Sequence, residues 1–129
     1  LTMEKVTAKI GAENYKTVVT SATSEFITDM PIDEGGQNLG PKPKELLAAA
    51  LAGCVAMTVK MYANRSKWLL EDVFVDVEID TETTPGTTIF TKNVSFTGNL
   101  TEEQTQRLHV IAQKCPINKI LQNPIVVKS

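Results

Sequence analysis

The chain has 129 residues, enough for one domain that buries a hydrophobic core of its own. Hydrophobic residues make up 42% and charged residues 22%, a composition typical of globular proteins and not of disordered ones. The 13 basic and 15 acidic residues give a net charge of -2 with no basic runs, which excludes nucleic acid as an expected partner. We therefore expect a single globular domain over residues 1–129.

The first third of the chain indicates a small antiparallel sheet. Apolar and polar residues alternate in 6–10, and two more short strands are predicted over 15–20 and 25–30. Residues 31–43 form a loop that is rich in glycine and proline. Pro43, at its end, suits the first turn of a helix, where its missing N–H costs nothing.

A long helix is predicted from Pro43 to about Ser66. Its first half is apolar on every side, which is typical of a helix that is buried all round. A chain of this length can hardly enclose such a helix, so we expect a second subunit to cover it and predict a homodimer. The uncharged stretch of about 14 residues is shorter than the roughly 20 of a membrane span and lacks a preceding signal-peptide n-region. We therefore expect a cytoplasmic protein without a membrane partner.

The second half of the chain indicates a hairpin followed by helices. Period-two alternation predicts a strand over 73–79, and the return strand covers 89–97. Thr101 and Gln104 form a capping box at the start of a helix that places Leu108, Ile111, Ala112 and Cys115 on one face.

Prolines and apolar residues define the end of the chain. Pro116 breaks the preceding helix and starts a shorter one through Leu121, and 125–127 is predicted as a terminal strand. The resulting order, βββ-α-ββ-αα-β, belongs to the α+β class.

The two cysteines are the main candidates for chemistry. Cys54 lies in the middle of the apolar helix, and Cys115 immediately precedes Pro116. They are 61 positions apart, so the sequence contains neither a C-x-x-C motif nor a zinc knuckle. Each thiol is either an inert core residue or a shielded nucleophile. The helix start after Cys115 favours a thiolate there, whereas the apolar neighbours of Cys54 favour the protonated form unless a cation reaches it.

The other candidate residues give weaker evidence for a chemical role than the cysteines do. Glu45 lies on the first turn of the long helix, where a carboxylate is favoured simply by the helix N-terminus. His109 is the sole histidine and is expected to face solvent on its helix. With two distant thiols it makes a poor ligand set, so we predict no metal. Met57 and Met61 are interpreted as core residues.

Two segments together resemble a known family. Gly40-Pro-Lys-Pro-Lys-Glu-Leu-Leu-Ala-Ala-Ala-Leu-Ala-Gly-Cys54, followed far downstream by Lys114-Cys115-Pro-Ile-Asn-Lys-Ile-Leu121, is similar to the OsmC/Ohr family of thiol-dependent peroxidases. The resemblance covers essentially the whole chain. It implies an intertwined α+β homodimer with antiparallel sheets around a long buried central helix, and active sites shared between the subunits.

The resemblance also implies a mechanism. Cys54 would be the thiolate that attacks a peroxide and becomes a sulfenic acid, and Cys115 would form a disulfide with it. Glu45 would be the carboxylate of the site. An external thiol or dithiol would reduce the enzyme, without a bound cofactor. The apolar surroundings of Cys54 favour an organic hydroperoxide over hydrogen peroxide.

The chain departs from the family pattern at two points. Well-known members have a glutamate directly after the proline that begins the helix, where this chain has Lys44. They also use an arginine from the N-terminal half, whereas the arginines here are Arg65 and Arg107. Lys42 and Lys44 are candidate replacements, although a lysine lacks the planar fork of an arginine.

Three functions remain open from the sequence. The first is a two-cysteine peroxidase in oxidative-stress defence. The second is an OsmC-like dimer that binds a small apolar or thiol-bearing ligand with little peroxidase activity. The third is a structural domain with inert thiols.

Overall fold

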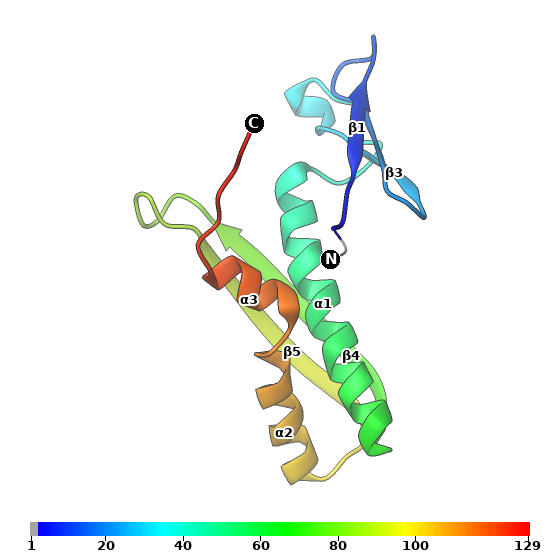
Figure 1. The fold of residues 1–129 in the computed structure, drawn as a ribbon, viewed down its shortest axis with the longest axis vertical. Coiled ribbons are helices and arrows are strands. Elements are labelled where there is room, and N and C mark those ends of the chain that lie inside the picture. The colour runs from blue at the N-terminus through cyan, green and yellow to red at the C-terminus, as the bar shows by residue number, and fades with distance from the viewer. Residues whose placement is uncertain (1–2) are drawn as a thin grey trace. The chain divides into compact units, whose positions relative to one another are not determined.

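The computed structural model describes residues 3–129 of the chain (Figure 1). The described residues form two antiparallel sheets and three α-helices, which confirms the predicted α+β class. The chain divides into two compact units, Leu1–Leu47 and Ala48–Ser129, and each is described by itself below.

The first unit contains the predicted meander. Strands β1 (Thr7–Ile10), β2 (Thr17–Thr20) and β3 (Glu25–Thr28) pair antiparallel in that order. Each strand is shorter than the alternating pattern predicted. Val19 is the buried hydrophobic residue of β2.

Asp29 organises the loop after the meander. The loop includes a short 3-10 helix, η1 (Ile32–Glu34). The buried Asp29 carboxylate accepts backbone N–H groups from Met30 at 2.8 Å, Leu39 at 3.2 Å and Gln37 at 3.3 Å. Burial disfavours the charged carboxylate, but these three hydrogen bonds outweigh it, so the pKa of Asp29 is lowered. The loop is thus held by a buried anion.

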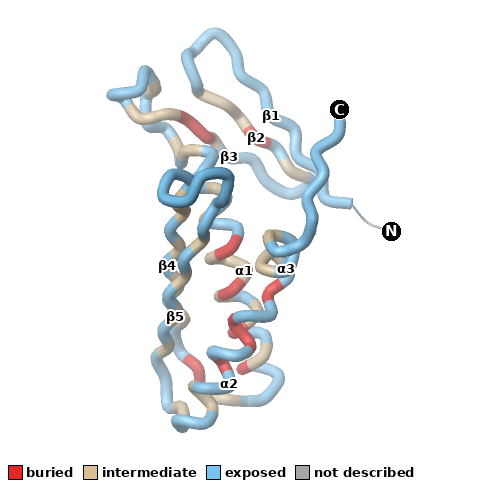
Figure 2. Tube along the Cα trace, turned by 90° about the vertical axis from the view of Figure 1, so that its left-hand side faces the viewer, coloured by how far each residue is buried: buried red, intermediate tan, exposed pale blue. Residues whose placement is uncertain are grey.

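Helix α1 (Pro43–Ser66) has the predicted bounds, and a single stripe of its surface is fully buried in this chain. The buried residues follow a four-residue spacing, Leu51, Val55, Val59 and Ala63. Met57 and Met61 are 62% and 54% exposed, so their interpretation as core residues is wrong for the single chain. The apolar faces that we expected a second subunit to cover are open here (Figure 2).

By length and composition alone, α1 is also apolar enough to cross a bilayer. Core helices of soluble proteins meet the same criterion, and α1 packs its buried stripe against a protein core.

The second unit is built on a long hairpin. Strand β4 (Leu69–Asp80) starts four residues before the predicted strand and pairs with β5 (Ile89–Asn99). A bulge lies between Leu70 and Asp72. Opposite it, Gly98 has φ 133°, and a Cβ atom there would overlap the Leu69 carbonyl oxygen. The bulge therefore requires glycine at this position.

Three helices cover one face of this hairpin (Figures 1 and 2). Helix α2 (Glu102–Ala112) starts with the predicted capping box, in which Thr101 and Gln104 each accept the other's backbone N–H. Helix α3 (Pro116–Gln122) follows the break at Pro116. The predicted apolar face is buried at all four positions, Leu108, Ile111, Ala112 and Cys115.

The predicted terminal strand over 125–127 is wrong. These residues have no strand structure, and Ile125, Val126 and Val127 are 62%, 76% and 91% exposed. A strand needs a neighbouring edge to supply its hydrogen bonds, and a short run of apolar residues alone does not provide one.

Candidate functional site

The second unit brings the two cysteines together. Both are free thiols. Cys115 is fully buried at the N-cap of α3, within the core cluster, and the half-buried Cys54 of α1 packs against that cluster. Cys54 lies close enough to Cys115 to raise the pKa of the Cys115 thiol. The pair singled out from the sequence is therefore assembled within one unit, although 61 positions separate its members.

The environment of Cys115 differs from the one expected. Burial raises the pKa of Cys115, and the neighbouring Cys54 raises it further. The N–H of Asn118 donates to the Cys115 sulfur at 3.3 Å and lowers the pKa, as a helix start should. The helix start therefore favours a thiolate at Cys115, as expected, but burial has the larger effect and the pKa of Cys115 is raised overall.

Cys54 opens onto a cleft with a volume of about 570 Å³. Most of its wall is one face of α1. This face lies about 100° around the helix axis from the buried stripe, which is the angle between neighbouring residues. The residues of the wall that define its character are Ala50, Cys54, Met57 and Met61 from α1, with Lys114 and Pro116 from the segment around Cys115. The cleft is thus mainly apolar, and a thiol lies in its wall.

Two cations border this cleft. Arg65 lies eleven residues after Cys54 on α1, which is close to three full helical turns, and both residues line the cleft. Lys114 lines it as well. The family pattern places an arginine in the N-terminal half, whereas in this chain the helical spacing from Cys54 places Arg65 on the face of α1 that lines the cleft. Lys42 and Lys44, the candidates from the sequence, belong to the first unit.

Arg107 has a different role. Its Nε donates to the Tyr62 hydroxyl at 3.1 Å, and its guanidinium lies 5.5 Å from the centre of the Tyr62 ring. The hydrogen bond from Arg107 is the main reason why the pKa of Tyr62 is lowered. Tyr62 also packs edge-on against Trp68, which follows the end of α1, at a centroid distance of 5.5 Å.

Glu45 lies in the first unit, at the third position of α1. Its carboxylate accepts the backbone N–H of Lys42 at 2.9 Å, a contact that satisfies one of the free N–H groups of the helix start. This contact gives Glu45 a structural role, and its catalytic role stays a prediction.

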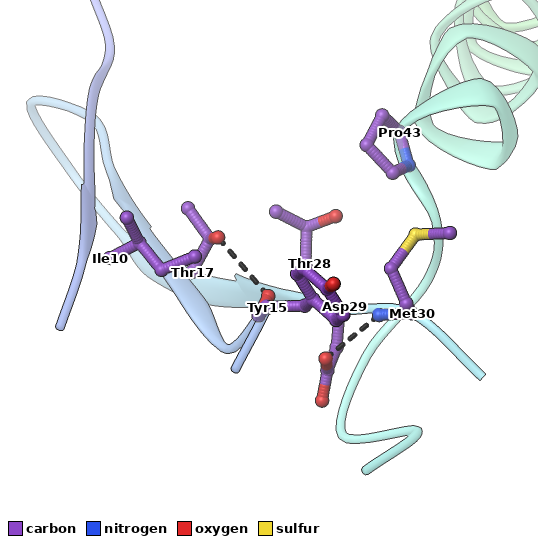
Figure 3. A pocket seen from close by; sticks show the side chains of 7 residues that line it. All are labelled: Ile10, Tyr15, Thr17, Thr28, Asp29, Met30 and Pro43. Atoms are coloured by element: carbon purple, nitrogen blue, oxygen red, sulfur yellow. Dashed lines mark hydrogen bonds between the residues drawn. The ribbon is translucent and has the colours of Figure 1, made fainter. Parts of the chain in front are cut away.

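The remaining candidates are minor. His109 is exposed, as predicted, and packs edge-on against Phe96. Within residues 3–129, no group of three His, Cys, Asp or Glu side chains is placed to hold a metal ion. A cavity of about 160 Å³ in the first unit is lined by Tyr15, Thr28 and Asp29 among others, and the Asp29 oxygens already accept backbone N–H groups (Figure 3).

Comparison with known proteins places the chain in a family. The family described as OsmC-like protein matches residues 35–129. A search of curated proteins found no match.

Solved structures share the fold. The organic hydroperoxide resistance protein OsmC of Legionella pneumophila is 27% identical, with 95% of this chain and 91% of that one covered and a TM-score of 0.63. OhrB of Bacillus subtilis, also an organic hydroperoxide resistance protein, is 23% identical, with 98% and 96% covered and a TM-score of 0.64. An OsmC-like protein from Mycoplasma pneumoniae is 17% identical, with 95% and 89% covered and a TM-score of 0.77. With a family match over most of its length, this chain belongs to the OsmC-like protein family.

Proposed function

We propose that this protein is a thiol-dependent peroxidase that reduces organic hydroperoxides. The observation that carries the proposal is the pairing of two free cysteines beside an open apolar cleft. Membership of the OsmC-like family supports it, as do structural neighbours that are named organic hydroperoxide resistance proteins.

The proposed reaction has three steps. The Cys54 thiolate attacks a peroxide oxygen, so that an S–O bond forms, the O–O bond breaks and the alkoxide leaves as the alcohol after protonation. The Cys115 sulfur then displaces hydroxide from the Cys54 sulfenic acid and forms the Cys54–Cys115 disulfide. An external thiol or dithiol reduces this disulfide by exchange and restores both thiols.

The surroundings of Cys54 suggest the substrate class. Met57 and Met61 give the cleft an apolar wall beside the thiol, so a hydroperoxide with a hydrocarbon tail gains more from burial there than hydrogen peroxide does. We further propose a cytoplasmic homodimer, in which the second subunit covers the open apolar face of α1 and completes the site.

Turnover assays with cysteine variants test the proposal. With a dithiol as reductant, wild-type protein should consume an alkyl hydroperoxide faster than hydrogen peroxide, and Cys54→Ser should abolish turnover. Cys115→Ser should accumulate a Cys54 sulfenic acid that dimedone traps. If Cys54→Ser retains the wild-type rate, Cys54 is not the reacting thiol and the proposal fails.

The second candidate is an OsmC-like protein that binds a small apolar or thiol-bearing ligand with little turnover. The spacing of Arg65 favours it, because eleven residues of helix separate the two Cα atoms by about 16 Å along the axis. That distance exceeds the reach of an arginine side chain, so Arg65 does not pair directly with the Cys54 sulfur. This candidate would be favoured if the protein binds a thioether analogue of a thiol-bearing ligand saturably but does not turn over hydroperoxide.

A further inference from the structure

Lys92 breaks the apolar pattern of strand β5. The side chains of Phe90, Val94 and Phe96 pack against the core on one face of the strand. Lys92 falls on the same face by its position, is half-buried, and lies opposite Val77 in the register. Lysine is seldom buried without a partner, because removing an ammonium group from water is costly.

The Lys92 ammonium group binds residues that lie before and after Cys115 in the sequence. Its Nζ donates to the Ala112 carbonyl at 3.3 Å and to Asn118 Oδ1 at 3.2 Å. Ala112 ends α2 three residues before Cys115, and Asn118 lies three residues after it. The backbone N–H of Asn118 donates to the Cys115 sulfur, and its side-chain amide donates to the Gln113 carbonyl at 3.1 Å. One network thus joins Lys92 to the turn that carries the thiol.

The groups that act on the Cys115 thiol come from three elements. From α1, the Cys54 thiol opposes ionisation, as does burial itself. On α3, the Asn118 N–H favours the thiolate, and from β5 the positive charge of Lys92 favours it too. The Lys92 ammonium group is the cation among these groups, and two hydrogen bonds fix its position.

We propose that Lys92 is a positioning residue that stabilises the Cys115 thiolate for the disulfide-forming step. This inference rests on the proposed peroxidase function. In that step the Cys115 thiolate attacks the sulfur of the Cys54 sulfenic acid, an S–S bond forms and the S–O bond breaks. The departing hydroxide takes up the proton that Cys115 released and becomes water. The Cys115 sulfur is oxidised by one level, and the Cys54 sulfur, already oxidised by the peroxide, is reduced by one.

A purely structural role for Lys92 predicts different results. A cation beside the last carbonyls of α2 stabilises that helix end, whatever the state of Cys115. Loss of that contact would lower the stability of the protein but would leave the ionisation of Cys115 unchanged.

The first test measures the ionisation of Cys115 in the absence of the Cys54 thiol. In Cys54→Ser protein labelled with ¹³C at cysteine Cβ, the chemical shift of Cys115 is followed as a function of pH. Lys92→Gln should move the titration midpoint to higher pH, whereas Lys92→Arg should keep it. Lys119→Gln removes the same charge from an exposed position of α3 and should leave the midpoint unchanged. Lys92→Met is the second variant if Lys92→Gln does not fold. An unchanged midpoint in a folded Lys92 variant overturns the proposal.

The second test follows disulfide formation in the two-cysteine protein. After mixing with an alkyl hydroperoxide, Lys92→Gln should form the Cys54 sulfenic acid at the wild-type rate but close the disulfide roughly tenfold more slowly at neutral pH. The defect should shrink as pH rises. Equal closure rates at every pH overturn the role of Lys92. A wild-type protein that forms no sulfenic acid overturns the peroxidase proposal instead, and the titration still decides whether Lys92 stabilises the thiolate.

Discussion

Cys115 is subject to two opposing effects, burial in the core and a helix N-terminus. The Asn118 N–H supports a thiolate, but burial and the neighbouring Cys54 raise the pKa of Cys115 overall. A thiol held in this way is protonated in the resting protein. In the proposed reaction, oxidation of Cys54 would remove one of the groups that oppose the ionisation of Cys115.

The raised pKa predicts a fall in stability at alkaline pH. Below the unfolded-state pKa of about 9.0, Cys115 is protonated in both the folded and the unfolded state, and its contribution to stability is fully present. Above that value the unfolded chain releases the proton first, so the free energy of unfolding of the reduced protein should fall as pH rises toward the folded-state pKa. Urea unfolding at neutral and alkaline pH measures this slope. Cys115→Ala should flatten it, and a slope that is the same in both proteins would contradict the assignment.

Glu45 can be tested for charge and capping separately. Glu45→Gln keeps an acceptor for the Lys42 N–H but removes the charge, whereas Glu45→Ala removes both. If the carboxylate acts in the reaction, as the family resemblance implies, both variants should slow the oxidation of Cys54 by roughly tenfold or more in stopped-flow measurements. Glu45→Ala should also lose about 1 kcal/mol of stability. A wild-type oxidation rate in Glu45→Gln would leave Glu45 with its capping role alone.

At the level of elements, the β4–β5 hairpin forms the platform of the second unit, and its bulge depends on Gly98. Gly98→Ala would place a Cβ against the Leu69 carbonyl oxygen at a backbone φ of 133°, a conformation that residues with side chains rarely adopt. We expect a loss of about 1–3 kcal/mol in the free energy of unfolding, measured by urea denaturation. Gly86→Ala is the matched control, because its φ is 71° but nothing lies near the added methyl group. Equal losses in both variants would mean that strain alone, without the clash, explains the effect.

Most elements could be predicted because their signals are local. The capping box at Thr101 and the proline at the start of α1 are each defined within a few residues, and the structure has both. The terminal strand could not be predicted correctly, because 125–127 has a strand-like pattern but a strand exists only where another edge pairs with it.

The sequence predicted which thiols belong to the candidate site, but it did not predict which cations lie near them. Cys54 and Cys115 stand in distinctive motifs, but Arg65 reaches the cleft by helical spacing. In the sequence, Lys92 lies two residues from both Phe90 and Val94, so it falls on the same face of the strand. This signal can be recognised once the inward face of β5 is known.

At the level of the whole molecule, the open apolar face of α1 predicts self-association. Met57 and Met61 are more than half exposed in the single chain, and burying them against a second copy would remove apolar area from water. Sedimentation velocity should give twice the chain mass of 14.1 kDa. Met61→Glu should shift the protein toward monomer, whereas Gln106→Glu adds the same charge at an exposed position of α2 and should not. A wild-type monomer at all concentrations would contradict the dimer.

In the proposed function, peroxide converts the two thiols into one disulfide. The most direct measurement treats the reduced protein with one equivalent of an alkyl hydroperoxide and maps its peptides by mass spectrometry without reduction. We predict a Cys54–Cys115 disulfide within each chain, formed as the peroxide is consumed. Two free thiols at the end of the reaction would contradict the proposed peroxidase function.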